Sequence, residues 1–387
     1  MKRYYLICIT LITFLSGCKE KPSRLAEEER IPVVENAKTE VVSYAKGFDL
    51  IKQGDITILT VSSPWPESDL KFTYALIEKS KLAYITLDAN AYDTIIGVPV
   101  EKIVVTSTTH IPVLEALGVE HTLVGFPDSH YISSKKTRDL IDSGQVKELG
   151  KNEAINTEVL IDLQPELVVG FSINSHNKAY ETIQKSRIPV VYNGDWTEHS
   201  PLGKAEWIKF FAPFFQKEEL AASIFNEIEK EYLNAKEIAK SFDERPTVFS
   251  GAMFKDVWYL PAGESWAAQF IKDANANYLW SDTPGTGSLS LNFESVLEKG
   301  QNAEFWIGPG QFTSYEQMRS AHAHYTHFEA FSNKNIYTYS SVKGETGGLL
   351  YYELAPNRPD LVLKDLISIF HPEALPDYKP SFFKPLQ

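Results

Sequence analysis

Short apolar runs alternate with stretches of helical spacing along residues 100–192. Ile103-Val104-Val105 is β-branched throughout, and a helical stretch over 112–117 follows it and ends at Gly118. The same pattern predicts strands at 122–125, 167–170 and 189–192, a helix beginning near Thr157 and a helix over about 176–186. Short buried strands separated by helices are typical of βαβ crossovers, so a mostly parallel sheet is predicted.

Residues 201–241 carry almost no strand signal. Apolar residues recur there near helical spacing, with many Lys and Glu between them: Leu202, Ile208, Phe211, Leu220, Ile224 and Ile228. Pro213 interrupts the run, so either one long helix with a break or two helices are expected.

The strand-helix alternation then resumes to the end of the chain. Strands are predicted at 247–249, 305–308 and 336–339, and helices at 264–273, 293–299 and 361–370. At the start of the first lobe, runs at 56–61 and 82–87, separated by the turn-rich segment 63–66, predict a small β-element.

These patterns predict an α/β fold with two Rossmann-like lobes, residues 43–198 and 244–387, whose sheets are mostly parallel. The segment 199–243 is expected to form the long connecting helix. A ligand cleft is expected between the lobes, because open α/β sheets bind ligands at the carboxyl ends of their strands.

The N-terminus has the features of an export signal. Lys2 and Arg3 precede an apolar run over 6–15, which is too short to span a membrane. Ser16-Gly17-Cys18 follows and resembles the lipobox of bacterial lipoproteins, which implies that residues 1–17 are removed and that Cys18 carries a lipid. An ordinary cleaved signal with a chance cysteine is the alternative. Residues 18–42 are charged at their start and predict a flexible tether.

Cysteine content and charge narrow the class of protein. Cys8 and Cys18 are the only cysteines, so the processed chain can form no internal disulfide and depends on its core. The chain carries a formal net charge of −13, and removing the two signal cations leaves −15. A nucleic-acid partner is not expected, because phosphates require a basic surface.

Two segments share a pattern that places a glutamate in the first turn of a short helix leading into a strand. One is Asn156-Thr157-Glu158 with Pro165-Glu166-Leu167-Val168, and the other is Asn292-Phe293-Glu294 with the strand at 305–308. A carboxylate at this position is favoured by the helix N-terminus, so local capping is sufficient to explain it.

These segments, with the run PVLEALG at 112–118, resemble the periplasmic binding proteins of iron-siderophore, haem and cobalamin ABC importers, over residues 104–372. The resemblance implies a substrate-binding component, not an enzyme, that captures a metal chelate without a resident cofactor. It further implies that Glu158 and Glu294, one per lobe, pair with arginines of the permease dimer, which works with an ATPase. We expect a monomer held in the periplasm by its lipid. The family's cobalamin binder has a Trp where this chain has Asn152, which puts cobalamin in doubt.

Aromatic and polar residues in loops after the strands are the candidate ligand contacts, although any single one is more often a packing residue. They are Trp65, His130, Tyr131, Trp196, Trp258, Tyr259 and Arg358. Aromatic walls suit a large, flat or macrocyclic chelate, and an arginine suits an anionic one.

Two other functions remain open. His322, His324 and His327 would serve a bare zinc- or manganese-binding protein of an ABC importer, but a surface loop is the favoured interpretation. A lipoprotein enzyme on the same scaffold is the other alternative. The chain lacks G-x-S-x-G, Walker and H-E-x-x-H motifs, and Gly308-Pro309-Gly310 and the Gly-rich run at 344–348 are interpreted as turns at the cleft edge.

Overall fold

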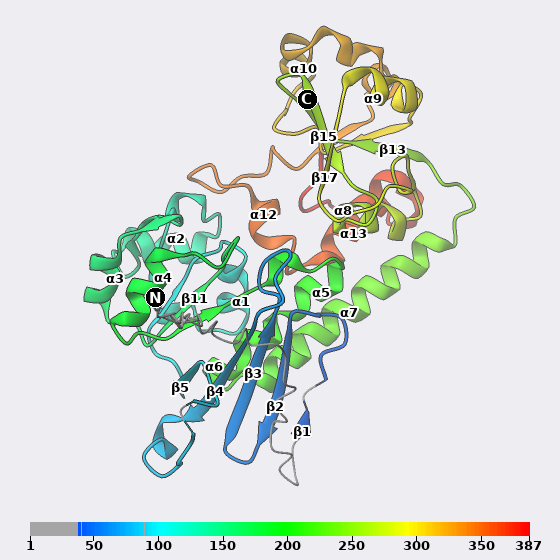
Figure 1. The fold of residues 1–387 in the computed structure, drawn as a ribbon. Helices are drawn as coiled ribbons and strands as arrows, with labels where there is room; N and C mark the ends of the chain where they lie inside the picture. The colour runs from blue at the N-terminus through cyan, green and yellow to red at the C-terminus, as the bar shows by residue number, and fades with distance from the viewer. Residues whose placement is uncertain (1–37, 40, 89) are drawn as a thin grey trace, which may run out of the picture. The chain divides into compact units, whose positions relative to one another are not determined.

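The computed structural model describes residues 38–39, 41–88 and 90–387 (Figure 1). The predicted signal peptide, Cys18 and nearly all of the predicted tether lie outside the described residues. Within these described ranges, no helix is both long and apolar enough to cross a membrane.

A five-stranded sheet opens the described chain. Its order is β1 (Lys38–Thr39), β2 (Phe48–Gln53), β3 (Ile56–Ser62), β4 (Lys71–Glu78) and β5 (Thr94–Val98). The predicted strand at 56–61 is confirmed as β3. The predicted strand at 82–87 is wrong: this segment follows the short 3-10 helix η1 (Lys79–Lys81) as a turn, and Tyr84 is 86 % exposed. The strand forms at 71–78 instead, because residues 71–77 pair with the whole of β3 and Tyr74 is buried.

The first lobe contains the predicted parallel sheet. Its order is β12 (Val190–Tyr192), β11 (Leu167–Gly170), β6 (Ile103–Val105), β7 (Leu123–Phe126) and β8 (Lys147–Glu148). The accompanying helices are α1 (His110–Ala116), α2 (Lys135–Asp142), α3 (Thr157–Leu163) and α4 (Lys178–Lys185). A two-stranded ribbon, β9 (Gly150–Lys151) and β10 (Ala154–Ile155), precedes α3.

Both faces of this sheet are buried, which explains its continuous apolar runs. Val104 and Val168 are register partners and join the hydrophobic cluster beneath α3 and α4. Their neighbours Val105 and Val169 point to the opposite face and join the cluster that contains α1 and α6. Successive strand residues face opposite sides, so a strand covered on both faces needs no polar alternation.

The connecting segment is three helices: α5 (Pro201–Glu206), α6 (Ile208–Phe215) and α7 (Glu218–Lys240). Pro213 lies inside α6, so the predicted break at this proline is wrong. The chain leaves the helix at Gln216, whose φ of 57° is left-handed, as is common at helix C-termini. Along α7 the buried residues recur every three or four positions and form one apolar stripe: Ala221, Phe225, Ile228, Tyr232, Ala235 and Ala239.

The second lobe has two sheets. The main one runs β16 (Asn277–Tyr278), β13 (Thr247–Ser250), β18 (Phe305–Ile307), β19 (Ile336–Thr338) and β20 (Lys384–Pro385), parallel except for β20. A smaller antiparallel sheet runs β14 (Ala252–Phe254), β15 (Val257–Pro261) and β17 (Ser288–Leu291). The helices are α8 (Trp266–Asp273), α9 (Phe293–Gly300), α10 (Tyr315–Ala321), α11 (Glu329–Ser332), α12 (Leu350–Leu354) and α13 (Pro359–Phe370). The predicted strands and helices are confirmed here, whereas the small antiparallel sheet was not predicted.

Candidate functional site

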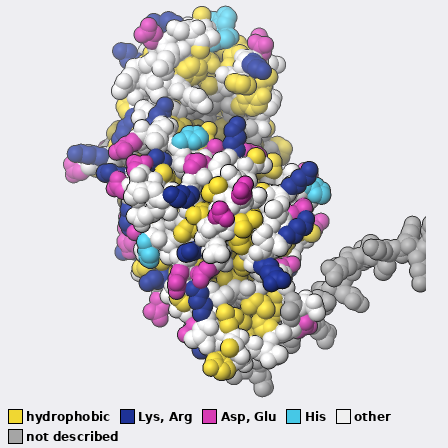
Figure 2. Space-filling view, turned by 90° about the vertical axis from the view of Figure 1, so that its left-hand side faces the viewer, with side chains coloured by type: hydrophobic (Ala, Val, Ile, Leu, Met, Phe, Trp, Pro, Cys, Tyr) yellow, Lys and Arg dark blue, Asp and Glu magenta, His cyan; other side chains and the backbone are white. Residues whose placement is uncertain are grey.

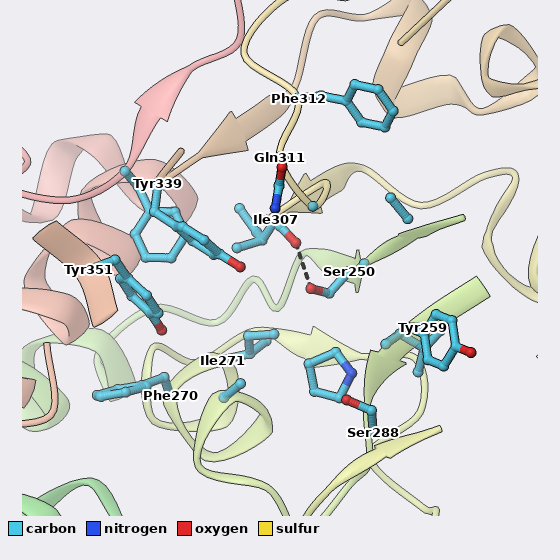
Figure 3. A pocket seen from close by; sticks show the side chains of 18 of the residues that line it. Ser250, Tyr259, Phe270, Ile271, Ser288, Ile307, Gln311, Phe312, Tyr339 and Tyr351 are labelled. Atoms are coloured by element: carbon cyan, nitrogen blue, oxygen red, sulfur yellow. Dashed lines mark hydrogen bonds between the residues drawn. The ribbon is translucent and has the colours of Figure 1, made fainter. Parts of the chain in front are cut away.

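A pocket of about 900 Å³ lies in the second lobe at the carboxyl ends of three parallel strands. Ser250 ends β13, Ile307 ends β18, and Tyr339 follows β19 (Figure 3). The volume falls within the range of small-molecule sites, and the carboxyl edge of an open α/β sheet is where such sites form. The small sheet closes one side through Tyr259, and α8 closes another through Trp266 and Phe270.

Aromatic side chains build one wall of this pocket. The rings of Tyr339 and Tyr351 stack with centroids 4.3 Å apart and 12° between their planes. Phe383, near the C-terminus, packs edge-on against Tyr339 at 5.8 Å. The hydroxyl of Tyr352 lies 3.1 Å from that of Tyr339. A flat or ring-rich ligand therefore meets a preformed aromatic surface.

A second recess of about 480 Å³ adjoins the pocket, because Gln311 and Tyr352 line both. Thr108 and Tyr131 contribute to it from the first lobe, and Lys343 contributes from the second. The two recesses together offer a site reached by residues of both lobes.

The segment 343–357 contacts the first lobe directly beside this recess. The Thr346 hydroxyl donates to the His130 carbonyl at 2.7 Å, and the Asn357 amide donates to the Thr109 carbonyl at 2.9 Å. A Cβ on Gly348 would lie 2.1 Å from the carbonyl oxygen of Tyr131, so only glycine permits this approach.

A buried carboxylate completes the contact. Glu353 on α12 accepts hydrogen bonds from the backbone N–H groups of Ser133 and Ser134, at 2.5 and 2.9 Å. Glu115, which accepts from the Ser134 hydroxyl, is a second carboxylate at this place. Burial raises the pKa of Glu353 to about 7, with repulsion from Glu115 adding to the rise.

We expect stability to depend on pH through Glu353. The folded protein binds the Glu353 proton more tightly than the unfolded chain does. The stability that this protonated carboxyl contributes is therefore complete below the unfolded pKa and is lost as the pH rises through about 7. Glu353→Gln is neutral at every pH and should gain about 3 kcal/mol relative to the wild type between pH 5 and 8.5. Urea unfolding at both pH values measures this, and a pH-independent difference between the two proteins would contradict it.

The seven predicted ligand contacts do not all lie together in the structure. Tyr259 lines the large pocket, and Tyr131 lines the adjoining recess. His130 is exposed beside Tyr131, with ring centroids 4.0 Å apart. Trp65 instead lines a different recess near His199 and packs on Tyr192, and Trp196 is 38 % exposed.

Trp258 and Arg358 have other roles in the structure. Trp258 lies within β15 rather than in a loop, is fully buried, and donates from its indole to the Ser250 carbonyl at 3.0 Å. The Arg358 guanidinium makes two hydrogen bonds to the Asp360 carboxylate, at 2.9 and 2.7 Å, so its charge is already paired. Neither residue lines the pocket or the adjoining recess, and we carry neither into the proposed ligand site.

Several pocket residues were not singled out from the sequence: Trp266, Gln311, Phe312, Tyr339, Tyr351, Tyr352 and Phe383. Gln311 follows Gly308-Pro309-Gly310 just after β18, so the rule that sites form after parallel strands could have identified it. Tyr351 and Phe383 come from a helix and the C-terminal segment, and no local pattern marks them.

Glu158 and Glu294 occupy equivalent positions in the first turns of α3 and α9, and both are exposed. The caps of these helices are asparagines: Asn156 accepts from the Val159 N–H at 3.1 Å, and Asn292 accepts from the Ser295 N–H at 2.7 Å. Among the described side chains, none makes a hydrogen bond or ion pair with either glutamate. The N-cap hydrogen bonds are therefore supplied by the asparagines, and the helix N-termini favour the two carboxylates without binding them.

Figure 2 shows the face that carries α2, α3 and α4, and there basic and acidic side chains are interspersed. Such a surface presents no extended field of one sign, so a partner that docks on it must recognise individual charges.

His322, His324 and His327 lie together, but few other metal-ligating side chains accompany them. Ring centroids of His322 and His324, and of His324 and His327, are each 5.1 Å apart, and the first two rings pack on Phe293. Across the part of the chain that the structure describes, no group of three or more His, Cys, Asp or Glu residues is arranged to hold a metal ion.

Known proteins resemble this chain in sequence and in fold. An uncharacterized lipoprotein of Methanocaldococcus jannaschii is 24 % identical and covers 98 % of this chain and 94 % of its own length. A possible iron-binding periplasmic solute-binding protein of Staphylococcus epidermidis superposes with a TM-score of 0.56 at 18 % identity, covering 70 % of this chain and 99 % of its own. The periplasmic haem-binding protein HutB of Vibrio cholerae gives 0.52 at 18 % identity, with 68 % and 99 % covered.

At these identities the solved structures establish the fold, which confirms the predicted α/β class with two lobes. The family model named periplasmic binding protein matches residues 103–342, which include the parallel strands of both main sheets and the connecting helices. Its members bind and transport solutes and are not enzymes. This chain therefore belongs to the periplasmic binding protein family.

Proposed function

We propose that this chain is the lipid-anchored solute-binding component of an ABC importer, and that it captures a metal chelate and delivers it to the permease. The aromatic pocket at the carboxyl ends of β13, β18 and β19 carries the proposal. A binding protein needs a preformed site of ligand size and no catalytic group, and this pocket meets both conditions.

Lipid attachment at Cys18 follows from the signal sequence and is supported by relatives that are named lipoproteins. The segment just after the predicted tether is held by the folded protein. The Glu206 carboxylate on α5 accepts hydrogen bonds from the N–H groups of Ser43, Tyr44 and Ala45 at 2.7–3.0 Å. The tether would thus connect the lipid to a segment that is fixed on the folded protein. Mass spectrometry of the purified protein should find Cys18 as the acylated first residue, and an unmodified N-terminus would overturn the anchor.

The geometry favours a chelate over a bare metal ion. Bare ions require converging carboxylate and imidazole ligands, whereas the pocket presents aromatic rings, hydroxyls and amides. The solved proteins named as iron-binding and haem-binding share this fold and support the same class of ligand.

Tryptophan fluorescence of the form lacking residues 1–18 should be quenched saturably by a ferric siderophore, haem or a cobalamin at micromolar concentration or below. Trp266 lines the pocket and reports on occupancy. Tyr351→Ala removes part of the aromatic wall and should weaken binding at least tenfold. Tyr84→Ala, at a residue 86 % exposed and outside the pocket, is the matched control.

Lack of any response to the three classes of chelate would contradict this function. Stoichiometric zinc or manganese in the purified protein, measured by inductively coupled plasma analysis, would then favour the bare-ion alternative.

The proposal places the protein in the periplasm, held to a membrane by its lipid, with the permease dimer and its ATPase as partners. Glu158 and Glu294 are the proposed docking residues. A monomeric state stays a prediction, which size-exclusion chromatography with light scattering can check.

A further inference from the structure

The large pocket has an unusual charge distribution. Among its 25 lining residues, all of them in the described part of the chain, there is no Asp, Glu, Lys, Arg or His. The chain as a whole has 38 basic and 51 acidic residues, so charged side chains are common elsewhere. Their absence from this lining is a specific property of the site.

Two buried tyrosines of the lining, Tyr339 and Tyr351, add no charge either. Burial raises the pKa of Tyr339 and of Tyr351, and neighbouring phenols add to the rise. Both hydroxyls therefore remain protonated throughout the physiological range, and they offer hydrogen bonds without charge.

Three charged groups near the pocket are already engaged by the protein, whereas the Lys255 ammonium lies 5.6 Å from the ring centroid of Phe254 at the edge of the lining. Arg358 is paired with Asp360, and Glu353 is held by the amides of Ser133 and Ser134. Asp365 accepts four hydrogen bonds from the C-terminal segment. Lys343, in the adjoining recess, is the one cationic residue among the described residues that line either space.

The remaining polar groups are neutral and few. Ser250 donates to the Ile307 carbonyl at 2.6 Å, and Gln317 accepts from Thr313. Figure 3 shows Gln311 entering the same space as Tyr339 and Tyr259, as an amide that can both donate and accept. Such groups orient a ligand but do not neutralise it.

We infer that the site selects a chelate of zero net charge with an apolar or aromatic face, and rejects chelates of the same metal that carry several negative charges. The inference rests on the proposed function and specifies its ligand. A multiply charged anion would lose its hydration on entering this aromatic pocket, whose own lining supplies no compensating cation. A neutral chelate of equal size loses far less hydration and gains the same contact with the rings.

Two iron complexes allow a neutral chelate to be compared with an anionic chelate of the same metal. Three singly charged hydroxamates cancel the charge of Fe³⁺, whereas three doubly charged catecholates leave a net charge of −3. We expect the full-length mature protein to bind a ferric trihydroxamate at least 100-fold more tightly than a ferric tris-catecholate, in fluorescence competition at 0.15 M salt. The affinity for the neutral complex should not change between 0.05 and 0.5 M salt, because no ion pair is formed.

A positive charge placed in the pocket should weaken the preference for the neutral complex over the anionic one. Gln311→Lys should reduce the ratio of the two affinities at least tenfold by attracting the anion. Gln301→Lys adds the same charge to the same lobe, at an exposed residue outside the pocket, and should leave the ratio unchanged.

The outcomes distinguish this inference from the proposed function. Equal affinity for the two complexes, or preference for the anion, overturns the neutral-ligand inference while leaving a chelate-binding function in place. Failure of both complexes, of haem and of cobalamins to bind contradicts the proposed function itself.

Discussion

Replacing Glu158 and Glu294 together by alanine is expected to abolish ligand uptake by cells while the purified protein keeps its ligand affinity. Both carboxylates are exposed, and neither caps its helix, because Asn156 and Asn292 already do so. Exposed charges on rigid elements set the register of docking and the association rate with a basic partner surface. Neither glutamate lines the pocket, so binding of the chelate should not change.

Each lobe offers a matched control for this experiment. Glu181 and Glu316 are likewise exposed glutamates in the first turns of helices, α4 and α10, one in each lobe. The Glu181→Ala/Glu316→Ala double variant should transport normally. Each single variant at Glu158 or Glu294 should retain part of the uptake, since one contact survives. Wild-type uptake by the Glu158→Ala/Glu294→Ala protein, at equal abundance in the membrane, would reject the docking assignment.

Asp365→Ala is expected to cost about 3 kcal/mol or more of folding stability, since each buried donor left unsatisfied costs about 1 to 3 kcal/mol. The Asp365 carboxylate is fully buried on α13 and accepts from the N–H groups of Ser381, Phe382 and Phe383 and from the Tyr378 hydroxyl, at 2.6–2.9 Å. Burial raises the pKa of this carboxyl even with four donors around it. Alanine would leave all four donors without a partner, and buried unsatisfied groups are costly.

The same change should weaken ligand binding, because Phe383 lines the pocket and packs on Tyr339. Asp365→Asn keeps one acceptor oxygen and should lose less stability than alanine. Urea unfolding of the three proteins measures the stabilities, and fluorescence titration measures the affinities. A loss below about 1 kcal/mol for Asp365→Ala would show that the C-terminal segment is held by its apolar contacts alone.

The two parallel sheets were readable from the sequence because their strands are buried on both faces. Ile103-Val104-Val105 and Leu167-Val168-Val169 are continuous apolar runs that need no partner to be recognised. Helices that precede strands of these sheets carry their own start signals, such as Asn156 before α3 and Asn292 before α9. The same local signals located Glu158 and Glu294.

Most of the antiparallel strands were not readable in this way, although β3 was predicted correctly. The segments 71–78 and 82–87 have similar local composition, and only pairing with β3 decides that the first becomes a strand. The small sheet formed by β14, β15 and β17 joins residues from 252 to 291, so its register is a long-range property. Trp258 became a core residue because β15 turns it inward, whereas Tyr259, the next residue, faces the pocket.

The sequence by itself therefore determined the α/β class, the two parallel sheets, the helical connection and the two exposed glutamates, all of which depend on short-range patterns of burial and capping. Tertiary structure alone decided the ligand pocket. Gln311, Tyr339, Tyr351 and Phe383 are up to 72 positions apart, and they meet because β18, β19, α12 and the C-terminal segment pack together. The absence of charge from that lining is likewise a property of which residues converge, which no local pattern encodes.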